Sequence, residues 1–490
     1  MTSRSRSGAR SQSGSFRDPG GRLVILDNRV FRFVNGAGAK NLHPWLQSEL
    51  CQQLVEQHKM VRTEILRPEH WPQALADPSF ARQFEAIEAV MIVEHERIWF
   101  PSFPTEWPPE MLHAAGRLTV EIALESLDAG FGLKDATPYN VLFDGPNAVF
   151  VDALSFERRD PADPVWLPYA QFVRTFLLPL LMNHHLGMHI DRLLAARPDG
   201  LEPEDVYHWL SLVQKLRPPF LSLVTIPKWL GGSRAAADGK IYQKRSTEDP
   251  AQARFVLRAL LNGLGRKLEG VEPEAGRTSA WSGYMQADGN HYSDEQFARK
   301  EDFVRRALED FGPRRVLDVG SNTGHFSLMS AGAGAHVVAI DSDPVVAGKL
   351  WRAARAQGAD VLPLVVNLAR PTPGSGWHNT ERASFLDRCA GAFDAVLMLA
   401  VLHHLLVTDR IPLDHILDLT AELTTSLAVV EFIEPSDPMF QRLTRGREHL
   451  HTDVTTAAFE QSCHRHFEIV RSERLPYANR WLYLLKKPGR

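Results

Sequence analysis

The sequence predicts an α/β chain in which a doubly wound parallel sheet occupies the carboxyl-terminal part and an α+β domain precedes it. The first observation is the stretch VLDVGSNTG at 316–324, where an apolar run is followed by two glycines, as in a buried strand that turns sharply into a helix. The second is HVVAIDSD at 336–343, a further apolar run that ends on Asp341. The third is the alternation of apolar runs with helical segments over the rest of the chain, which a doubly wound fold requires.

The remaining strands follow in order. VLPLVV at 361–366 predicts a third strand, with Asn367 at its end, and FDAVLML at 393–399 predicts a fourth. LAVVEFIEP at 427–435 predicts a fifth. FEIVRSERL and RWLYLLKK near the carboxyl end predict a closing pair of strands.

The residues around the glycine turn indicate which cofactor the sheet would bind. Gly320 and Gly324 let the backbone turn and approach a ligand, and Asp341, about 20 residues further on, is placed to accept hydrogen bonds from ribose hydroxyls. NAD is one candidate, but Asn322 stands where the GxGxxG motif has its second glycine, so the turn suits a diphosphate poorly. Asp318 would repel a phosphate, whereas it suits the ammonium and sulfonium of S-adenosylmethionine.

With these motifs, the segment 281–490 resembles the class I S-adenosylmethionine-dependent methyltransferases, and departs from their commonest glycine motif at Asn322. The resemblance implies a Rossmann-like, seven-stranded sheet and S-adenosylmethionine as the cofactor. It also implies that the segment 281–308 supplies a lid and the first helix over the cofactor. The cofactor-binding residues that we expect are Asp318, Gly320, Ser321, Asn322, Gly324, Asp341, Asn367 and Tyr292. No metal is expected in this domain.

A general base is needed if the methyl acceptor is a hydroxyl or a protonated amine. His403 and His404 follow the fourth strand in LAVLHHLL, and an imidazole titrates near neutrality. The same pair is also compatible with the start of a helix in this fold. Both histidines are therefore candidates for the catalytic base.

A second constellation lies in LKDATPYNVLFDGPNAVFVDALSFE at 133–157. Asp135 and Asn140 stand five residues apart, and Asp152 follows a predicted hairpin. In phosphoryl transfer, an aspartate orients the acceptor hydroxyl, and an asparagine and a second aspartate hold metal ions. The segment is similar to the catalytic core of protein and aminoglycoside kinases, which implies a kinase-like domain over 21–230 that binds ATP and Mg²⁺ through these three residues.

Most other residues of the kinase signature are missing from the sequence. Leu133 and Lys134 replace the usual His and Arg, and no glycine-rich loop precedes a strand that bears a lysine. The amino-terminal lobe is therefore expected to be reduced to a short hairpin. The segment 107–127 has apolar residues at helical spacing, which predicts a core helix before the catalytic loop.

Composition narrows the class of protein. The 490 residues carry a formal charge of −4, which makes nucleic acid an unlikely partner. The three cysteines are too few and too scattered for a disulfide framework, so we expect a cytoplasmic protein. Residues 1–20 are rich in Ser, Arg and Gly and are expected to form a disordered tail with no secretory signal. The most apolar run, at 176–182, is too short for a membrane span.

A linker with a bracing helix is expected over 231–280, between the two domains. The whole arrangement resembles a group of bacterial proteins described as nodulation-type or methyltransferase-domain proteins. Our main hypothesis is methyl transfer from S-adenosylmethionine to a small-molecule or glycan-type acceptor. The alternatives are a phosphotransferase or nucleotide-binding pseudokinase activity of the amino-terminal domain, and a scaffold without catalysis that binds ligands.

Overall fold

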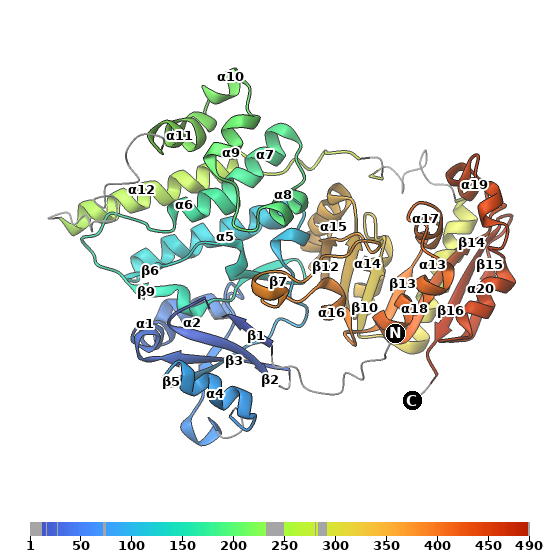
Figure 1. The fold of residues 1–490 in the computed structure, drawn as a ribbon, viewed down its shortest axis with the longest axis horizontal. Coiled ribbons are helices and arrows are strands. Elements are labelled where there is room, and N and C mark those ends of the chain that lie inside the picture. Colours follow the sequence, from blue (N-terminus) through green and yellow to red (C-terminus); the bar gives the residue numbers. More distant parts are fainter. Residues whose placement is uncertain are drawn as a thin grey trace.

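The computed structural model describes residues 12–15, 17–26, 28–71, 75–231, 249–279, 281–282 and 292–488. The chain forms two halves that lie side by side, with the amino-terminal sheet and the helices that follow it in one half and the large sheet in the other (Figure 1). Residues 283–291 of the predicted lid lie outside the described residues. Among the helices of the described residues, none combines the length and the apolar character that crossing a membrane would take.

The carboxyl-terminal half contains the predicted seven-stranded sheet, in the order β12-β11-β10-β13-β14-β16-β15. The strands are β10 (Arg315–Val319), β11 (His336–Asp341), β12 (Val361–Val365), β13 (Phe393–Met398), β14 (Thr424–Ile433), β15 (Glu468–Arg474) and β16 (Arg480–Lys486). The first five are parallel, whereas β16 runs antiparallel to both β14 and β15. The prediction of a doubly wound, Rossmann-like fold is confirmed, and each predicted strand agrees with the structure to within a few residues.

Helices cover both faces of this sheet, as the alternation of side chains along each strand requires. On one face, residues such as Val316 and Ala339 pack with α13 (Asp294–Phe311), α14 (His325–Gly332) and α15 (Pro344–Gln357). On the other face, residues such as Leu317 and Val338 join a larger core with the remaining helices. These are α16 (Phe385–Cys389), α17 (Leu402–Val407), α18 (Leu413–Leu423), α19 (Pro438–Thr444) and α20 (Thr456–Cys463).

The amino-terminal half begins with a five-stranded antiparallel sheet, in the order β1-β2-β3-β5-β4. Its strands are β1 (Gln12–Ser15), β2 (Gly21–Leu26), β3 (Arg29–Asn35), β4 (Thr63–Ile65) and β5 (Ala89–His95), and its helices are α1 (Gly36–Leu46), α2 (Glu49–Glu56) and α4 (Pro78–Ala86). The lobe is thus larger than the hairpin that we expected. Residues 12–15 pair with β2 instead of belonging to a disordered tail, because a polar segment can still complete an edge through backbone hydrogen bonds.

A helical region follows, built on α5 (Pro109–Asp128), which agrees with the helix predicted at 107–127. Two short hairpin-like sheets join β6 (Phe131–Leu133) with β9 (Phe156–Arg158), and β7 (Val141–Asp144) with β8 (Asn147–Phe150). The other helices are α6 (Tyr169–Phe172), α7 (Leu178–Leu186), α8 (Ile190–Ala196), α9 (Pro203–Trp209), α10 (Leu212–Lys215), α11 (Ile226–Gly231) and α12 (Pro250–Glu269).

Helix α12 lies in the segment expected to link the two domains. It packs along α5, and its buried leucines recur at helical spacing, at Leu257, Leu261, Leu264 and Leu268. At its end, the ring of His113 on α5 contacts the backbone carbonyl of Leu268, with Nε2 and O 3.0 Å apart. The helix therefore belongs to the amino-terminal core.

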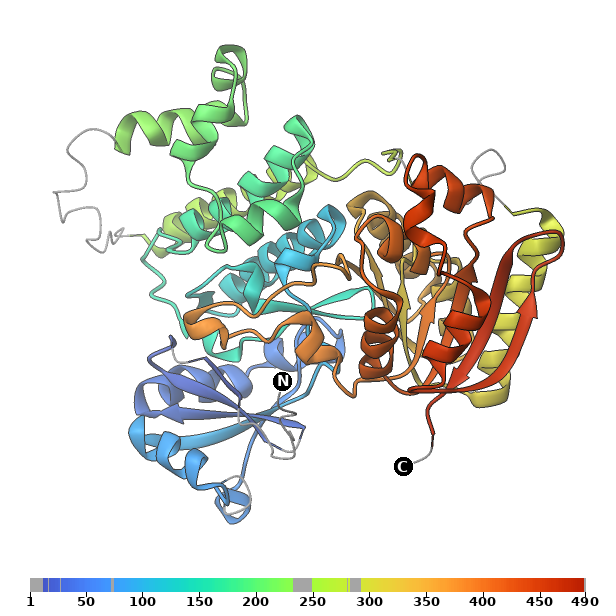
Figure 2. The same cartoon turned by 45° about the vertical axis from the view of Figure 1, so that its right-hand side comes forward.

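Aromatic side chains and hydrogen bonds join the two halves. The ring of Phe100 lies 5.5 Å from that of Phe393 and 6.1 Å from that of Phe385. The indole of Trp351 on α15 donates a hydrogen bond to the carbonyl of Pro146, with Nε1 and O 3.0 Å apart. Figure 2 shows that the segment between β12 and β13 reaches the amino-terminal half, where the guanidinium of Arg382 lies 3.8 Å from the ring centre of Tyr139. The halves therefore share one continuous core.

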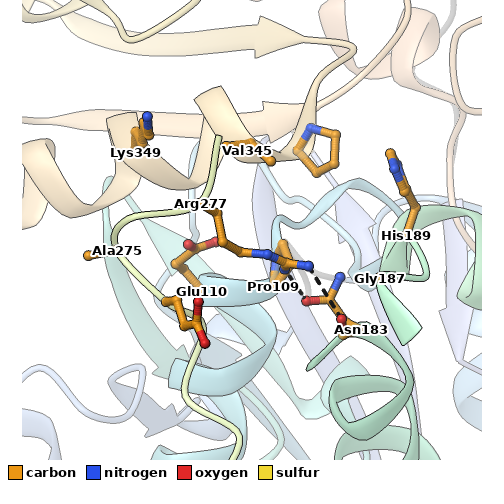
Figure 3. A pocket seen from close by; sticks show the side chains of 11 residues that line it. Pro109, Glu110, Asn183, Gly187, His189, Ala275, Arg277, Val345 and Lys349 are labelled. Atoms are coloured by element: carbon orange, nitrogen blue, oxygen red, sulfur yellow. Dashed lines mark hydrogen bonds between the residues drawn. The ribbon is translucent and has the colours of Figure 1, made fainter. Parts of the chain in front are cut away.

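A small polar seam completes this junction (Figure 3). Arg277, after α12, donates from Nη1 to the side-chain oxygen of Asn183 on α7 at 2.6 Å. Glu110 on α5 and Lys349 on α15 also line the cavity, which measures about 40 Å³. Such a volume holds a few water molecules but no substrate, so the seam is a structural contact.

Candidate functional site

A cavity of about 340 Å³ lies at the carboxyl ends of β10, β11, β12 and β13. Ligands of open α/β sheets bind in the crevice outside these strand ends. Its polar or charged lining residues are Trp281, Asn322, Asp341, Ser342, Asn367, Arg370, His404, Thr408 and Asp409. The rest of the wall consists mainly of apolar side chains, such as those of Ile340, Leu399 and Val401, and of the backbone at Gly320. We call it the cofactor cavity.

Two residues shape the turn at its floor. Gly320 has a φ of 68°, and a Cβ there would lie 2.2 Å from Cγ2 of Val401, so no other residue fits without movement. Asn322 also lies in the left-handed region, with a φ of 50°, which asparagine tolerates better than most residues. Its backbone N–H donates to Oδ2 of Asp341 at 2.9 Å. An asparagine can therefore replace the second glycine of the motif here.

Asp341 presents its carboxylate to the cavity. Oδ1 accepts a hydrogen bond from the backbone N–H of Asp343 at 3.0 Å, and the bond from Asn322 fixes Oδ2. The pKa of this carboxyl is raised, chiefly by burial, and the hydrogen bonds from the backbone of Asp343 and Asn322 partly oppose the shift. Each carboxylate oxygen keeps a lone pair for another donor. A cofactor that carries ribose hydroxyls fits this arrangement.

The next strand end supplies a polar group of a different kind. The side-chain oxygen of Asn367 accepts from the backbone N–H of Ala369 at 2.9 Å, which orients the amide of this exposed side chain at the cavity wall. Nearby, Arg370 pairs with Asp409 at 2.8 Å and closes the rim. With the apolar wall at Leu399, the pocket offers a purine both a flat apolar surface and hydrogen-bonding groups.

Four of the residues expected to bind the cofactor do not line the cavity that the described residues outline. The carboxylate of Asp318 is 3% exposed and accepts a hydrogen bond from Oγ of Ser327 on α14 at 2.6 Å. Burial raises its pKa to about 7. The prediction that its charge faces a cationic cofactor is not met, because Asp318 is on the face of β10 that packs against α14.

Gly324 and Ser321 support the turn instead of lining the cavity. Gly324 has a φ of 84°, and a Cβ there would lie 2.0 Å from Cδ1 of Leu350, so this glycine lets α14 pack closely on α15. Ser321 is 8% exposed, and its hydroxyl has no hydrogen-bond partner among the described residues.

Tyr292 belongs to a buried ionic network beside β14. Its hydroxyl donates to Oε1 of Glu431 at 2.6 Å, and Nζ of Lys300 donates to Oε2 at 2.7 Å. Arg480 and Asp437 form a second buried pair at 2.8 Å in the same region. The network satisfies the charges that it buries, so it has the properties of a structural element.

The two histidines after β13 differ in their surroundings. His404 lines the cofactor cavity, and its ring contacts that of Trp281 with 5.4 Å between centres. Burial lowers the pKa of His404, and the charge of Asp409 partly opposes this. His403 is 3% exposed, does not line the cavity, and its Nδ1 has no hydrogen-bond partner in the described part of the chain. Its pKa is lowered far more, by burial and by nearby positive charge.

In the amino-terminal half, the structure brings Asp135, Asn140 and Asp152 into one region. The amide of Asn140 donates to the hydroxyl of Ser155 at 3.1 Å and lies 3.4 Å from the carbonyl of Asp135. The hydroxyl of Ser155 donates to Oδ2 of Asp152 at 2.6 Å. The carboxyl of Asp135 has a raised pKa, because of partial burial and the charge of Asp152.

Asp152 is also held by Arg32 on β3, with Nη1 and Oδ1 2.5 Å apart. Burial by itself would raise the pKa of Asp152, but the charge of Arg32 and the bond from Ser155 lower it overall. A guanidinium thus neutralises the carboxylate that the kinase resemblance assigns to a metal ion. Within the described residues, no cluster of three or more His, Cys, Asp or Glu side chains could hold a metal.

Several residues of the cofactor cavity were not predicted. Trp281 reaches it from the start of the predicted lid, tied by a hydrogen bond from Nδ2 of Asn322 to its carbonyl at 3.0 Å. Arg370 and Asp409 come from two loops that are distant in the sequence. Only Trp281 could have been found from the sequence, because it lies in the predicted lid segment 281–308, whereas the other two depend on how the loops pack.

Comparison with known proteins identifies the segment 291–476 as a match to a family model described as a methyltransferase domain. Nodulation protein NoeA of Rhizobium meliloti (strain 1021) is 28% identical over 478 residues, which cover 97% of this chain and 96% of that protein. Among solved structures, the N-methyltransferase NodS from Bradyrhizobium japonicum WM9 is 12% identical, with a TM-score of 0.30, over 40% of this chain and 99% of that chain. The bifunctional kinase-methyltransferase WbdD is 18% identical, with a TM-score of 0.30, over 44% of each chain.

Proposed function

We propose that the chain, whose segment 291–476 matches a methyltransferase-domain model, transfers a methyl group from S-adenosylmethionine to a small-molecule or glycan-type acceptor and uses His404 as the base. The observation that carries this proposal is that Asp341, Asn367 and His404 line one cavity at the carboxyl ends of the strands. The cofactor, when bound, supplies an electrophilic methyl carbon. The protein then chiefly aligns the acceptor with it.

In this proposal, Asp341 binds the ribose hydroxyls and Asn367 contacts the adenine. The turn at Gly320 and Asn322 lets the backbone approach the rest of the cofactor. Asp318, Ser321, Gly324 and Tyr292 act on cofactor binding indirectly, by holding the turn and the neighbouring helices.

His404 is the better of the two candidate bases. Its lowered pKa keeps the imidazole neutral at pH 7, so it can accept a proton from a hydroxyl or an ammonium. The carboxylate of Asp409 is close enough to favour the imidazolium that would form. His403 is enclosed among positive charges and has no comparable access.

The test uses S-adenosylmethionine with a deuterated methyl group, incubated with the full chain and bacterial small-molecule and glycan extracts. Mass spectrometry should detect labelled products, and His404→Gln should slow their formation by about 10²–10⁴-fold, the usual contribution of a general base. The affinity for S-adenosylhomocysteine, measured in parallel, separates a loss of cofactor binding from a loss of the base, because His404 lines the cavity. Labelling at the wild-type rate by His404→Gln would remove it as the base, and no labelled product from a folded protein that binds the cofactor would contradict the acceptor class.

The amino-terminal constellation is not part of the proposed reaction, because the Arg32–Asp152 pair occupies the carboxylate that a metal would need. We also propose that the protein is located in the cytoplasm, because Cys51, Cys389 and Cys463 are all buried free thiols. Fractionation of cells that express the protein would test the location.

A further inference from the structure

A second, larger cavity shares helix α17 with the cofactor cavity. His404 and Leu405 line the cofactor cavity, whereas Leu406 and Val407 line the second one. Its other walls come from residues 410–414, the end of α19, the short helix Glu448–His451 and α20. We call it the cap cavity. Its volume of about 480 Å³ is within the range of small-molecule sites, roughly 300–1,000 Å³.

Most of the cap cavity is lined by aliphatic side chains. Leu406, Val407 and Val454 are buried in its wall, and Ile411 and Leu450 complete it. Leu450 is 57% exposed. An aliphatic ligand would remove this surface from water, which is favourable.

The charged groups of the cap cavity are unbalanced. Arg410 and Arg447 line it, and neither side chain has a carboxylate partner in the described part of the chain. Asp414 is already engaged, by Arg465 at 2.7 Å and by the hydroxyl of Ser462 at 2.6 Å. Asp453 is the remaining carboxylate of the described lining. Two available guanidiniums against one available carboxylate favour an anion, which arginine binds well.

We propose that the cap cavity is a binding site for a small amphiphilic anion, with an aliphatic body and a carboxylate or phosphate group. The aliphatic part lies along Leu406, Val407 and Val454, and the anionic group is bound by Arg410 and Arg447. Since the site is distinct from the cofactor cavity, it does not depend on the proposed methyl transfer. Its occupant would lie beside the helix that carries His403 and His404.

The test measures binding of octanoate to the full chain by calorimetry, with octylamine as the probe of opposite charge. Octanoate should bind, and octylamine should not. The variant Arg410→Gln with Arg447→Gln should bind octanoate about 100-fold more weakly, because each charge-assisted contact contributes about tenfold. The matched control is Arg442→Gln, since Arg442 is an exposed arginine of α19 outside the lining, and its affinity should be that of the wild type.

The affinity for S-adenosylhomocysteine, measured in parallel, shows that each variant is folded and separates this test from that of the methyltransferase. If the double variant lost its fold, Ala458→Phe would replace it, because a phenyl ring at this lining position should block octanoate and spare the cofactor.

Equal binding of octanoate and octylamine, equal affinity of the double variant and the wild type, or no binding of octanoate would each overturn the proposal. Binding to vesicles that contain phosphatidylglycerol, without binding of free octanoate, would also overturn it, because it would indicate a membrane surface as the ligand.

Discussion

A buried carboxylate next to the glycine turn makes the stability of the protein depend on pH. Asp318 is 3% exposed and its pKa is about 7, chiefly because of burial, well above the value of about 3.9 in an unfolded chain. Between these two values the folded state binds more protons than the unfolded state, so stability falls as pH rises through this window. Above the folded pKa the loss is complete and constant.

Asp318→Asn should remove this dependence and keep an oxygen for the hydroxyl of Ser327. The wild type should lose stability between pH 5 and pH 8, and the variant should not. The free energy of unfolding of the variant minus that of the wild type should therefore increase by about 2–4 kcal/mol over this range. Urea titrations followed by circular dichroism at both pH values measure it. A constant difference would show that Asp318 is ionised throughout, stabilised by the charge of Lys300.

A second prediction at the scale of residues concerns the stability that the Arg32–Asp152 pair contributes. Both side chains are largely buried, so Asp152→Ala would leave an uncompensated guanidinium and should destabilise the protein by about 3–5 kcal/mol. The double variant Arg32→Met with Asp152→Ala should recover most of this loss. Urea denaturation compares the three proteins. A neutral or stabilising effect of Asp152→Ala alone would mean that the carboxylate is not committed to Arg32.

At the scale of elements, the turn from β10 to α14 is the part that shapes the cofactor cavity. Gly320 needs a positive φ and also a close approach to Val401. The two requirements can be tested separately. With a side chain at 320, a smaller residue at 401 would remove the collision between the two side chains, whereas the strain of a positive φ at 320 would remain.

Gly320→Ala should therefore weaken binding of S-adenosylhomocysteine by at least about tenfold and destabilise the fold by more than about 1 kcal/mol. Adding Val401→Ala should restore part of the stability. Gly332→Ala is the matched control, since Gly332 belongs to α14 and a Cβ there meets nothing within 4 Å. Calorimetry and thermal melts measure both effects. Equal behaviour of Gly320→Ala and Gly332→Ala would refute the role of the turn.

Most strands with apolar runs were predicted from the sequence, although β5 was missed. The five parallel strands of the large sheet were predicted because buried parallel strands are continuously apolar, and the antiparallel pair β15 and β16 was predicted from FEIVRSERL and RWLYLLKK. Strands β1 and β4 were missed because they are short and polar, and their pairing depends on β2 and β5. Such edges depend on tertiary contacts, which a local pattern does not record.

Within the site, the location of a residue could be predicted where the chain geometry fixes it, whereas its role in binding stays a prediction. Residues at strand ends and in the turn, such as Asp341 and Asn367, must lie at the crevice. Asp318 lies within β10, where alternation decides the face, and its side chain points to α14. Arg370 and Asp409 meet only because two loops pack together, so the sequence pattern contained no signal for them.

At the scale of the whole molecule, one face of the large sheet belongs to the same hydrophobic core as the amino-terminal half. A buried ion pair between Arg388 on α16 and Glu106 crosses the junction, with 5% and 0% of the side chains exposed. Arg388 also donates to the carbonyl of Pro101 at 2.7 Å. The two halves should therefore unfold together.

Scanning calorimetry should show one cooperative transition for the full chain. Arg388→Ala leaves Glu106 buried without its partner and should lower the stability by about 3–5 kcal/mol, and separate the transition into two. Arg258→Ala, which removes an exposed pair with Asp128, should cost at most about 1 kcal/mol and keep a single transition. Two transitions in the wild type would contradict a shared core.

We propose that the cavity at the strand ends binds S-adenosylmethionine through Asp341. Isothermal titration calorimetry with S-adenosylhomocysteine tests it on the full chain, with Asp360→Ala as the control because Asp360 pairs with His336 away from the cavity. We predict binding by the wild type and the control, and a loss of at least about tenfold in Asp341→Ala, since a charged acceptor of two ribose hydroxyls is removed. No binding by the wild type, or an unchanged affinity in Asp341→Ala, would contradict the claim.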